Sequence, residues 1–192
     1  MPRAVDVDER RIELAAAAAR VIARAGLGGA TMREVAAEAG WTTGALTHYF
    51  ADKRELLQFT LEMSLEGRRA QGIGRRELPP DAALRAALVA ALPFDEQARL
   101  HWIVTVAFCA HAVGDAELAE IQRDAYRAYR DDIAQLVARA RRARGARAKR
   151  EAERLIALAD GVALQALFDP ESWPEARQLA VIDDALDARS LG

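Results

Sequence analysis

Apolar residues recur every three or four positions along most of the chain, which is the spacing that places them on one face of an α-helix. The first such stretch covers residues 9–25, with an apolar stripe formed by Ile12, Ala15, Ala16, Ala19 and Ile22. Gly26 is expected to end this helix, because glycine tolerates the positive φ that a helix C-terminus often adopts. Similar patterns predict further helices at about residues 32–39, 43–49, 52–67, 81–91, 95–113, 116–143, 150–168 and 174–188. No stretch keeps the period-two alternation of a half-buried strand, so the sequence predicts an all-α protein.

The composition agrees with this pattern, because Ala, Leu, Arg and Glu are abundant and are strong helix formers. A length of 192 residues suits one or two domains. The segment from Gly72 to Pro80 is rich in helix breakers and predicts a joint. We expect an N-terminal domain at residues 9–56 and a second domain, a helical bundle, at residues 57–190.

Three features bear on where the protein works. No apolar stretch reaches the length of a membrane span, so no membrane contact is expected. The first eight residues are polar and acidic and lack the apolar centre of a signal peptide. Cys109 is the only cysteine, which excludes an intramolecular disulfide. These features predict a cytoplasmic protein.

The bulk charge does not favour a nucleic-acid partner. The formal net charge is −2, and residues 1–60 carry eight Arg and Lys against eight Asp and Glu. These totals therefore lack the excess of basic residues that is typical of DNA-binding proteins. Any DNA binding must depend on the local geometry of a motif.

Residues 31–50 have the local features of a helix-turn-helix. Thr31 and Glu34 form a capping box, in which the hydroxyl accepts a hydrogen bond from the Glu34 amide and the carboxylate reaches the Thr31 amide. Gly40 ends this short helix and supplies the positive φ of a tight turn. Thr42 then caps a third helix of seven residues, which spans roughly 10 Å and suits the ~12 Å width of the major groove.

The same geometry predicts which side chains face DNA. Leu46 and Phe50 are expected to point inward, and Thr43 to contact base edges. Amides at the helix starts near Thr31 and Lys53 favour phosphate oxygens. A second capping box, Asp52 to Glu55, opens the fourth helix. The predicted DNA contacts are Thr31, Arg33, Thr42, Thr43, Gly44, Thr47, His48, Tyr49 and Lys53, with His48 and the Tyr49 hydroxyl placed near phosphates.

The residues from Thr31 through Gly40, Gly44 to Phe50 and Asp52 to Leu57 resemble the TetR family of bacterial transcriptional regulators. The match covers about residues 9–60. It implies a homodimeric, all-helical repressor with an N-terminal DNA-binding domain and a C-terminal domain for ligand sensing and dimerisation. Its implied partners are operator DNA and a small-molecule effector. More faintly, residues 155–170 are similar to the C-terminal domain of the choline-responsive BetI subgroup.

The chain departs from the family pattern at two positions. Thr47 stands where the family usually has an aromatic residue, so an operator sequence cannot be carried over. Trp41 stands where the family usually has an aliphatic residue. Two roles fit Trp41, packing under the turn or contacting the DNA backbone, and the sequence does not decide between them.

The C-terminal helices mix aromatic and polar residues, as a ligand pocket between bundle helices requires, although most such residues serve the core. The residues predicted to line this pocket are Trp102, Phe108, Cys109, His111, Tyr126, Tyr129, Gln165 and Phe168. No cluster of Cys, His and Asp has the spacing of a metal site. No nucleophile elbow, phosphate-binding glycine loop or zinc-protease motif occurs. We therefore expect no enzyme activity, no catalytic residue, no metal and no cofactor.

Residues 139–150 hold seven basic side chains in twelve positions. We interpret this run as a solvated helix end and connector rather than a second DNA site, because cations suit a helix C-terminus.

Dimerisation is predicted through the helices at about 150–168 and 174–188. Their apolar positions at helical spacing would form a four-helix interface with a second copy. These positions are Leu155, Leu158, Val162, Leu179, Ile182 and Leu186. Two other classes compete with a ligand-responsive repressor: a helical interaction module whose helix-turn-helix is vestigial, and a small helical enzyme.

Overall fold

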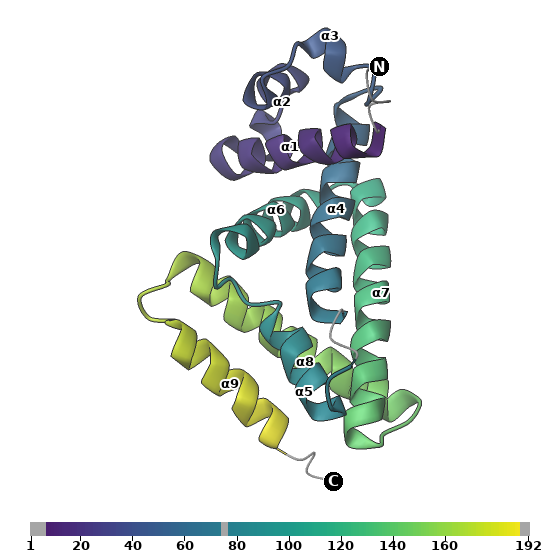
Figure 1. Ribbon diagram of the computed structural model, residues 1–192, viewed down its shortest axis with the longest axis vertical. Helices are drawn as coiled ribbons and strands as arrows, with labels where there is room; N and C mark the ends of the chain where they lie inside the picture. Colours follow the sequence, from purple (N-terminus) through teal and green to yellow (C-terminus); the bar gives the residue numbers. More distant parts are fainter. Residues whose placement is uncertain (1–6, 74–76, 189–192) are drawn as a thin grey trace. The chain divides into compact units, whose positions relative to one another are not determined.

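The computed structural model describes residues 7–73 and 77–188, and every regular element within these ranges is an α-helix (Figure 1). In chain order the helices are α1 (Val7–Gly29), α2 (Met32–Ala39), α3 (Thr43–Leu46), α4 (Lys53–Ile73), α5 (Pro80–Val89), α6 (Glu96–Ala112), α7 (Ala116–Arg141), α8 (Ala146–Phe168) and α9 (Glu175–Asp187). The all-α prediction is thereby confirmed. Across the same ranges, no helix combines the length and the apolar character that crossing a membrane requires.

The predicted helices are present, but several of their ends are shifted. α4 continues past Gly67, because a glycine costs a helix only ~1 kcal/mol and does not by itself end it. α8 begins at Ala146, directly after Gly145, whereas the apolar pattern predicted a start near residue 150. α3 differs in the other direction and is shorter than predicted.

The buried face of α1 differs from the predicted stripe. Ile12 is 46% exposed and Ala16 is also exposed, so these two assignments were wrong. Leu14 and Val21 are fully buried instead. An alanine-rich run has several faces of nearly equal apolar character, and spacing alone does not select the one that packs.

The chain divides into two compact units. Unit 1 comprises Met1–Glu66 and Ile103–Gln122, and unit 2 comprises Gly67–Trp102 and Arg123–Gly192. α4, α6 and α7 therefore each contribute residues to both units. The boundary that the sequence predicts between two domains, at residues 56 and 57, stays a prediction.

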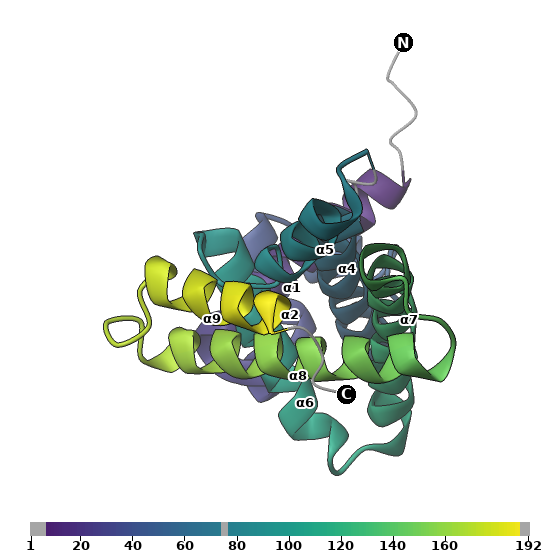
Figure 2. The ribbon, with the colours of Figure 1, turned by 90° about the horizontal axis from the view of Figure 1, so that it is seen from below.

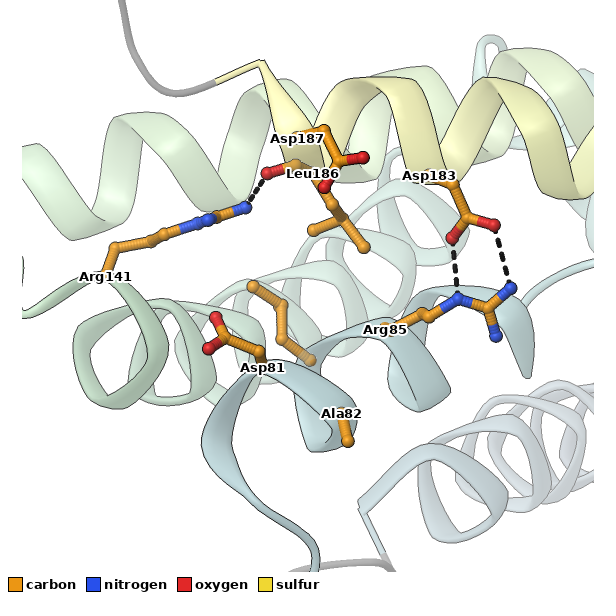
Figure 3. A pocket seen from close by; sticks show the side chains of 8 residues that line it. Asp81, Ala82, Arg85, Arg141, Asp183, Leu186 and Asp187 are labelled. Carbon is orange, nitrogen blue, oxygen red and sulfur yellow. Dashed lines mark hydrogen bonds and ion pairs between the residues drawn. The ribbon is translucent and has the colours of Figure 1, made fainter.

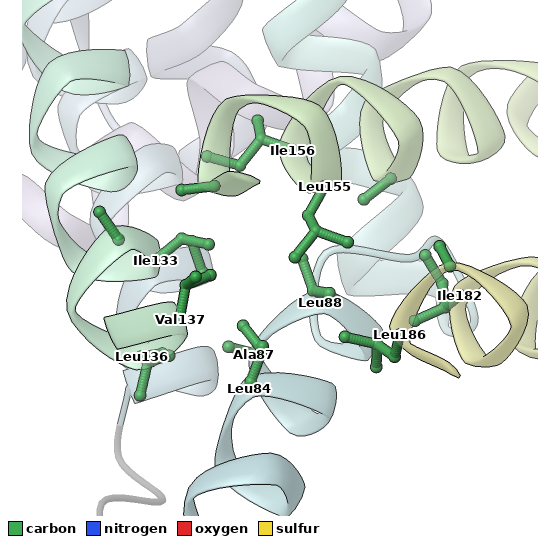
Figure 4. Close-up of a cluster of buried hydrophobic side chains, with 14 of the residues drawn as sticks. Leu84, Ala87, Leu88, Ile133, Leu136, Val137, Leu155, Ile156, Ile182 and Leu186 are labelled. Carbon is green, nitrogen blue, oxygen red and sulfur yellow. The ribbon is translucent and has the colours of Figure 1, made fainter. Parts of the chain in front are cut away.

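Unit 2 is built around an aliphatic core (Figure 4). α5, α7, α8 and α9 all contribute side chains that are at most 1% exposed, among them Leu84, Leu88, Ile133, Val137, Leu155 and Ile182. Burying one such side chain stabilises the fold by roughly 1.5–3 kcal/mol. Within this unit α8 and α9 run side by side in opposite directions (Figures 1 and 2).

This core corrects the predicted dimer interface. Of the six apolar residues assigned to it, Leu155, Val162, Ile182 and Leu186 are at most 9% exposed within one chain. They cannot also contact a second copy, so their assignment was wrong. The period that marks an apolar helix face is the same whether the face covers its own core or a partner, and the sequence does not separate the two.

Candidate nucleic-acid interface

The turn between α2 and α3 is built as predicted except for one bond of the first capping box. The Thr31 amide donates to the Gly29 carbonyl at 2.8 Å, so the predicted return bond to the Glu34 carboxylate was wrong. The hydroxyl of Thr31 accepts a hydrogen bond from the Glu34 amide at 3.2 Å and caps α2. Gly40 ends α2 in the left-handed conformation, with φ 74° and ψ 25°. The amide of Gly40 donates to Ala37 and that of Trp41 to Ala36, at 3.1 and 2.8 Å, which is a Schellman motif. Only glycine adopts this φ without steric cost, so the tight turn depends on it.

α3 begins as predicted and ends early. The Thr42 hydroxyl accepts from the Ala45 amide at 3.1 Å. Leu46 and Phe50 are both 0% exposed and anchor the segment to unit 1, as predicted. After Leu46 the amides of His48 and Tyr49 bond three residues back instead of four, at 3.2 and 3.0 Å. The seven-residue helix was therefore wrong, because its last turn tightens into the 3₁₀ type.

Small polar groups cover the outer side of this segment. Thr43, Gly44, Thr47 and His48 are all exposed. The Thr47 hydroxyl donates to the Gly44 carbonyl at 2.8 Å, so its oxygen still accepts. A capping hydroxyl such as that of Thr42 uses a lone pair and keeps its hydrogen for an outside acceptor. The surface thus offers both donors and acceptors to a base edge or a phosphate.

The residues that flank this surface are basic. Arg33 projects from the first turn of α2 with its side chain 85% exposed. Lys53 begins α4 and donates from Nζ to the Gly28 carbonyl at 3.2 Å, leaving two of its three ammonium donors for other acceptors. Tyr49 is half-buried beside the turn. All nine predicted contact residues therefore belong to unit 1, and their roles toward DNA stay predictions.

The start of α4 carries the second predicted cap. The Asp52 carboxylate accepts from the Glu55 amide at 2.9 Å. The return bond differs from the prediction, because the Glu55 carboxylate accepts from the Ala51 amide at 2.8 Å. Together these bonds join the end of the helix-turn-helix to α4.

Two arginines of α1 complete the site, and no pattern in the sequence indicates either of them. The Arg11 guanidinium lies between the rings of Phe50 and Phe59, 4.5 and 4.6 Å from their centroids, and pairs with Glu55 at 3.0 Å. Arg10 lies over the ring of Trp41 at 5.5 Å. These contacts join residues more than thirty positions apart, which periodicity does not reveal.

α1 and α2 are also joined by a shared carboxylate. Glu38 accepts from Arg20 at 2.8 Å and from Arg24 at 3.0 Å. These two hydrogen bonds lower the pKa of Glu38 below its ordinary value. The carboxylate therefore stays ionised and holds both guanidinium groups.

The residues predicted to line a ligand pocket are distributed over both units. In unit 1, Phe108 is buried, Cys109 is half-buried and His111 is exposed. In unit 2, Trp102 is buried and donates to the Ala91 carbonyl at 2.7 Å, as a core residue does.

The other pocket candidates in unit 2 differ from one another in burial. The Tyr126 hydroxyl donates to Asp160 at 3.0 Å, and Tyr129 is half-buried. Gln165 and Phe168 are exposed at the end of α8. The pocket stays a prediction.

A cavity of about 580 Å³ lies between α5, the end of α7 and the end of α9 in unit 2 (Figure 3). Arg85 donates two hydrogen bonds to Asp183, at 2.6 and 2.9 Å. This pair raises the pKa of Arg85 and lowers that of Asp183. Arg141 donates to the carbonyl of Leu186. None of the residues that line the cavity belongs to the predicted ligand pocket.

Comparison with known proteins matches two separate stretches of the chain. Residues 14–58 match the family model described as "Bacterial regulatory proteins, tetR family". Residues 80–190 match the model described as "BetI-type transcriptional repressor, C-terminal". The chain is 36% identical over 173 residues to the HTH-type transcriptional regulator PksA of Bacillus subtilis, covering 88% of this chain and 84% of that protein.

Solved structures of other transcriptional regulators have the same fold. A transcriptional regulator from Rhodococcus sp. Rha1 has a TM-score of 0.80 and 32% identity, over 92% of this chain and 93% of that one. A putative transcriptional regulator from Saccharomonospora viridis in complex with choline has a TM-score of 0.83 over 95% and 97% of the two chains. The second is 20% identical and shows a shared fold alone.

Proposed function

The chain belongs to the TetR family of bacterial regulatory proteins and is a DNA-binding transcriptional regulator, and from this premise we propose that it acts as a homodimeric repressor of a palindromic operator. The observation that carries the proposal is the polar outer side of residues 42–48, held over the buried anchors Leu46 and Phe50. In a helix-turn-helix this segment enters the major groove. Repression needs only that the bound protein exclude the polymerase.

The contact residues take two roles in this proposal. Thr43 reads base edges, and Gly44 and Thr47 lie along the same exposed side. Phosphate contacts come from the remaining predicted residues, which are Thr31, Arg33, Thr42, His48, Tyr49 and Lys53.

Dimerisation is proposed through α8 and α9, with a different set of residues from the one that periodicity suggested. Leu164 and Phe168 on α8 are 42% and 72% exposed, which supports burial against a second copy. A two-fold axis would place the α3 helices of the two chains on the two half-sites of a palindrome.

The proposed switch is a small molecule that binds the dimer conformation with low DNA affinity. The choline complex of the Saccharomonospora viridis regulator supports an effector of this size, without naming the one used here. The protein would act in the cytoplasm, where DNA is accessible, and would have no catalytic activity.

A gel-shift titration with the DNA upstream of its own gene tests the proposal. We expect sequence-selective binding with a steep salt dependence. Lys53→Ala should weaken all sequences alike, and Thr43→Ala should change the base preference. An intact dimer that binds no sequence selectively at modest salt would contradict the proposal. Equal losses for the two variants on every sequence would contradict the assigned roles.

A further inference from the structure

Arg10 is the residue of α1 that lies against the turn of the helix-turn-helix. Its guanidinium lies 5.5 Å from the centroid of the Trp41 ring, and Trp41 meets Tyr49 edge-on at 5.5 Å and 73°. Arg10 also pairs with Glu13 at 2.7 Å, and its side chain is 41% exposed. The three side chains Arg10, Trp41 and Tyr49 form a continuous series of contacts from α1 to the residues that follow α3. The hydrogen bond to Glu13, and to a smaller extent the phenol of Tyr49, raise the pKa of Arg10.

Residues 41–51 form the reading segment, and they supply no charge to this region. Residues 41–51 contain no Asp, Glu, Lys or Arg. Protein–DNA affinity depends strongly on cations that neutralise phosphates, so these must come from neighbouring elements. Arg33 and Lys53 are such cations on α2 and α4, and α1 borders the segment on a third side.

The other arginines of α1 already form ion pairs with residues of this unit. Arg20 and Arg24 share the carboxylate of Glu38. Arg11 is enclosed by two aromatic rings and paired with Glu55. Arg10 differs, because it is held on one face by Trp41 and, among the residues that the structure describes, pairs with Glu13 of its own helix.

Trp41 explains how Arg10 is held. The hydrogen bond from its amide to Ala36 fixes its backbone, and its half-buried ring, which meets Tyr49 edge-on, supports the guanidinium. A guanidinium that stacks on a ring keeps its N–H groups at the edge, where they reach an outside acceptor. Trp41 therefore packs against the turn, and a shorter aliphatic side chain would offer Arg10 no such surface.

We propose that Arg10 contacts a DNA phosphate beside the reading helix and that Trp41 positions its guanidinium for that contact. This inference rests on the proposed DNA-binding role of the helix-turn-helix. Glu13 holds the guanidinium in the free protein through Nη1. The remaining guanidinium N–H groups bond the phosphate, or the phosphate replaces Glu13 altogether.

The test measures binding to a long duplex of mixed sequence as a function of KCl, because a phosphate contact is independent of sequence. Arg10→Ala should bind about tenfold more weakly. The slope of log affinity against log salt should fall by about 0.9 for each phosphate that the variant no longer neutralises, or about 1.8 for a dimer. Arg127→Ala is the matched control, because Arg127 forms the same kind of pair, at 2.7 Å with Asp124 three residues away, in unit 2. It should change neither quantity.

Glu13→Gln separates a phosphate contact from a structural ion pair. If Arg10 served only to pair with Glu13, Glu13→Gln and Arg10→Ala would reduce the affinity equally. We expect the opposite: Glu13→Gln should bind as tightly as the wild type or more tightly. Equal reductions would overturn the proposal.

Trp41 is tested by an aromatic and an aliphatic replacement. Trp41→Phe keeps a ring and should preserve the salt slope, whereas Trp41→Leu should lower it. Arg10→Ala should then add little to Trp41→Leu, because both remove the same contact. An unchanged slope in Arg10→Ala would overturn the proposal even if every other prediction held. Wild-type protein that fails to bind the duplex at low salt would contradict the proposed function itself, which is a distinct result.

Discussion

The helix-turn-helix at residues 31–50 and the aliphatic core of unit 2 are stabilised in different ways. In the first, α2 and α3 are eight and four residues long, and both start with a threonine whose hydroxyl accepts from a backbone amide. In the second, α8 and α9 are 23 and 13 residues long, and their N-cap residues, Gly145 and Pro174, form no side-chain cap. They depend on apolar side chains buried between α5, α7, α8 and α9, together with Trp102 of α6.

The difference has a functional consequence. A helix of four residues is too short to be stable alone, so α3 needs its cap, its turn and two buried anchors. Each cap contributes about 1 kcal/mol and leaves the outer side of the segment polar and small. The core residues of unit 2 contribute more each, but they are not available to a ligand outside. Substitutions in the two regions should therefore differ in size and in what else they change.

The largest effect is expected in the core of unit 2. Leu155 is 1% exposed, and Leu155→Ala should lower the free energy of unfolding by about 3 kcal/mol, since a cavity remains where the side chain was. Urea unfolding followed by circular dichroism measures this loss. Glu153→Ala on the same helix is the control and should change stability by less than ~0.5 kcal/mol, because Glu153 is exposed. Equal losses would mean that burial does not distinguish the two sides of α8.

The next effect is expected in the turn. Gly40→Ala should lower stability by about 1–2 kcal/mol, because a Cβ is unfavourable at a φ of 74°. A Cβ at this position meets no atom within 4 Å, so the cost comes from the backbone conformation rather than a clash. Thermal unfolding gives the change in stability. A variant as stable as the wild type would show that the turn does not need the left-handed conformation.

Gly44 differs from Gly40, because the expected change in stability has the opposite sign. It lies inside α3 and a Cβ there also meets no atom within 4 Å. Gly44→Ala should raise stability by about 0.5–1 kcal/mol through helix propensity. The same methyl group should weaken operator binding, because it occupies space next to the groove. Tighter binding in the gel shift would contradict the assignment of Gly44 to the contact surface.

The smallest effect is expected at the exposed pair of Arg85 and Asp183. The pKa of Asp183 is lowered by its hydrogen bonds from Arg85, so the pair stabilises the fold above the unfolded pKa of about 3.9. This contribution is lost as the pH falls through the lower, folded pKa. Both side chains are more than 40% exposed, so we expect roughly 0.5 kcal/mol or less. The difference in Tm between wild type and Asp183→Asn should be present at neutral pH and vanish in acid. A difference in Tm that persists unchanged in acid would show that it arises from packing and not from the ion pair.

Several features of the helix-turn-helix could be predicted from the sequence alone. Thr31, Gly40 and Thr42 were assigned correctly because the groups they satisfy lie within five residues along the chain. Leu46 and Phe50 were assigned to the interior on their spacing, and both are fully buried. Local backbone chemistry of this kind is carried by the order of the residues themselves.

The remaining features required the folded chain. The buried face of α1, the early end of α3 and the true neighbours of Leu155 and Ile182 depend on which helices pack together. Arg11 contacts Glu55, 44 residues away, and Arg10 contacts Trp41 across the turn. Hydrophobic period shows that a helix has an apolar face, but not what covers it. The sequence by itself thus determined the helices, the caps and the turn, whereas the tertiary structure decided which arginines support the reading segment and which apolar residues remain for a partner.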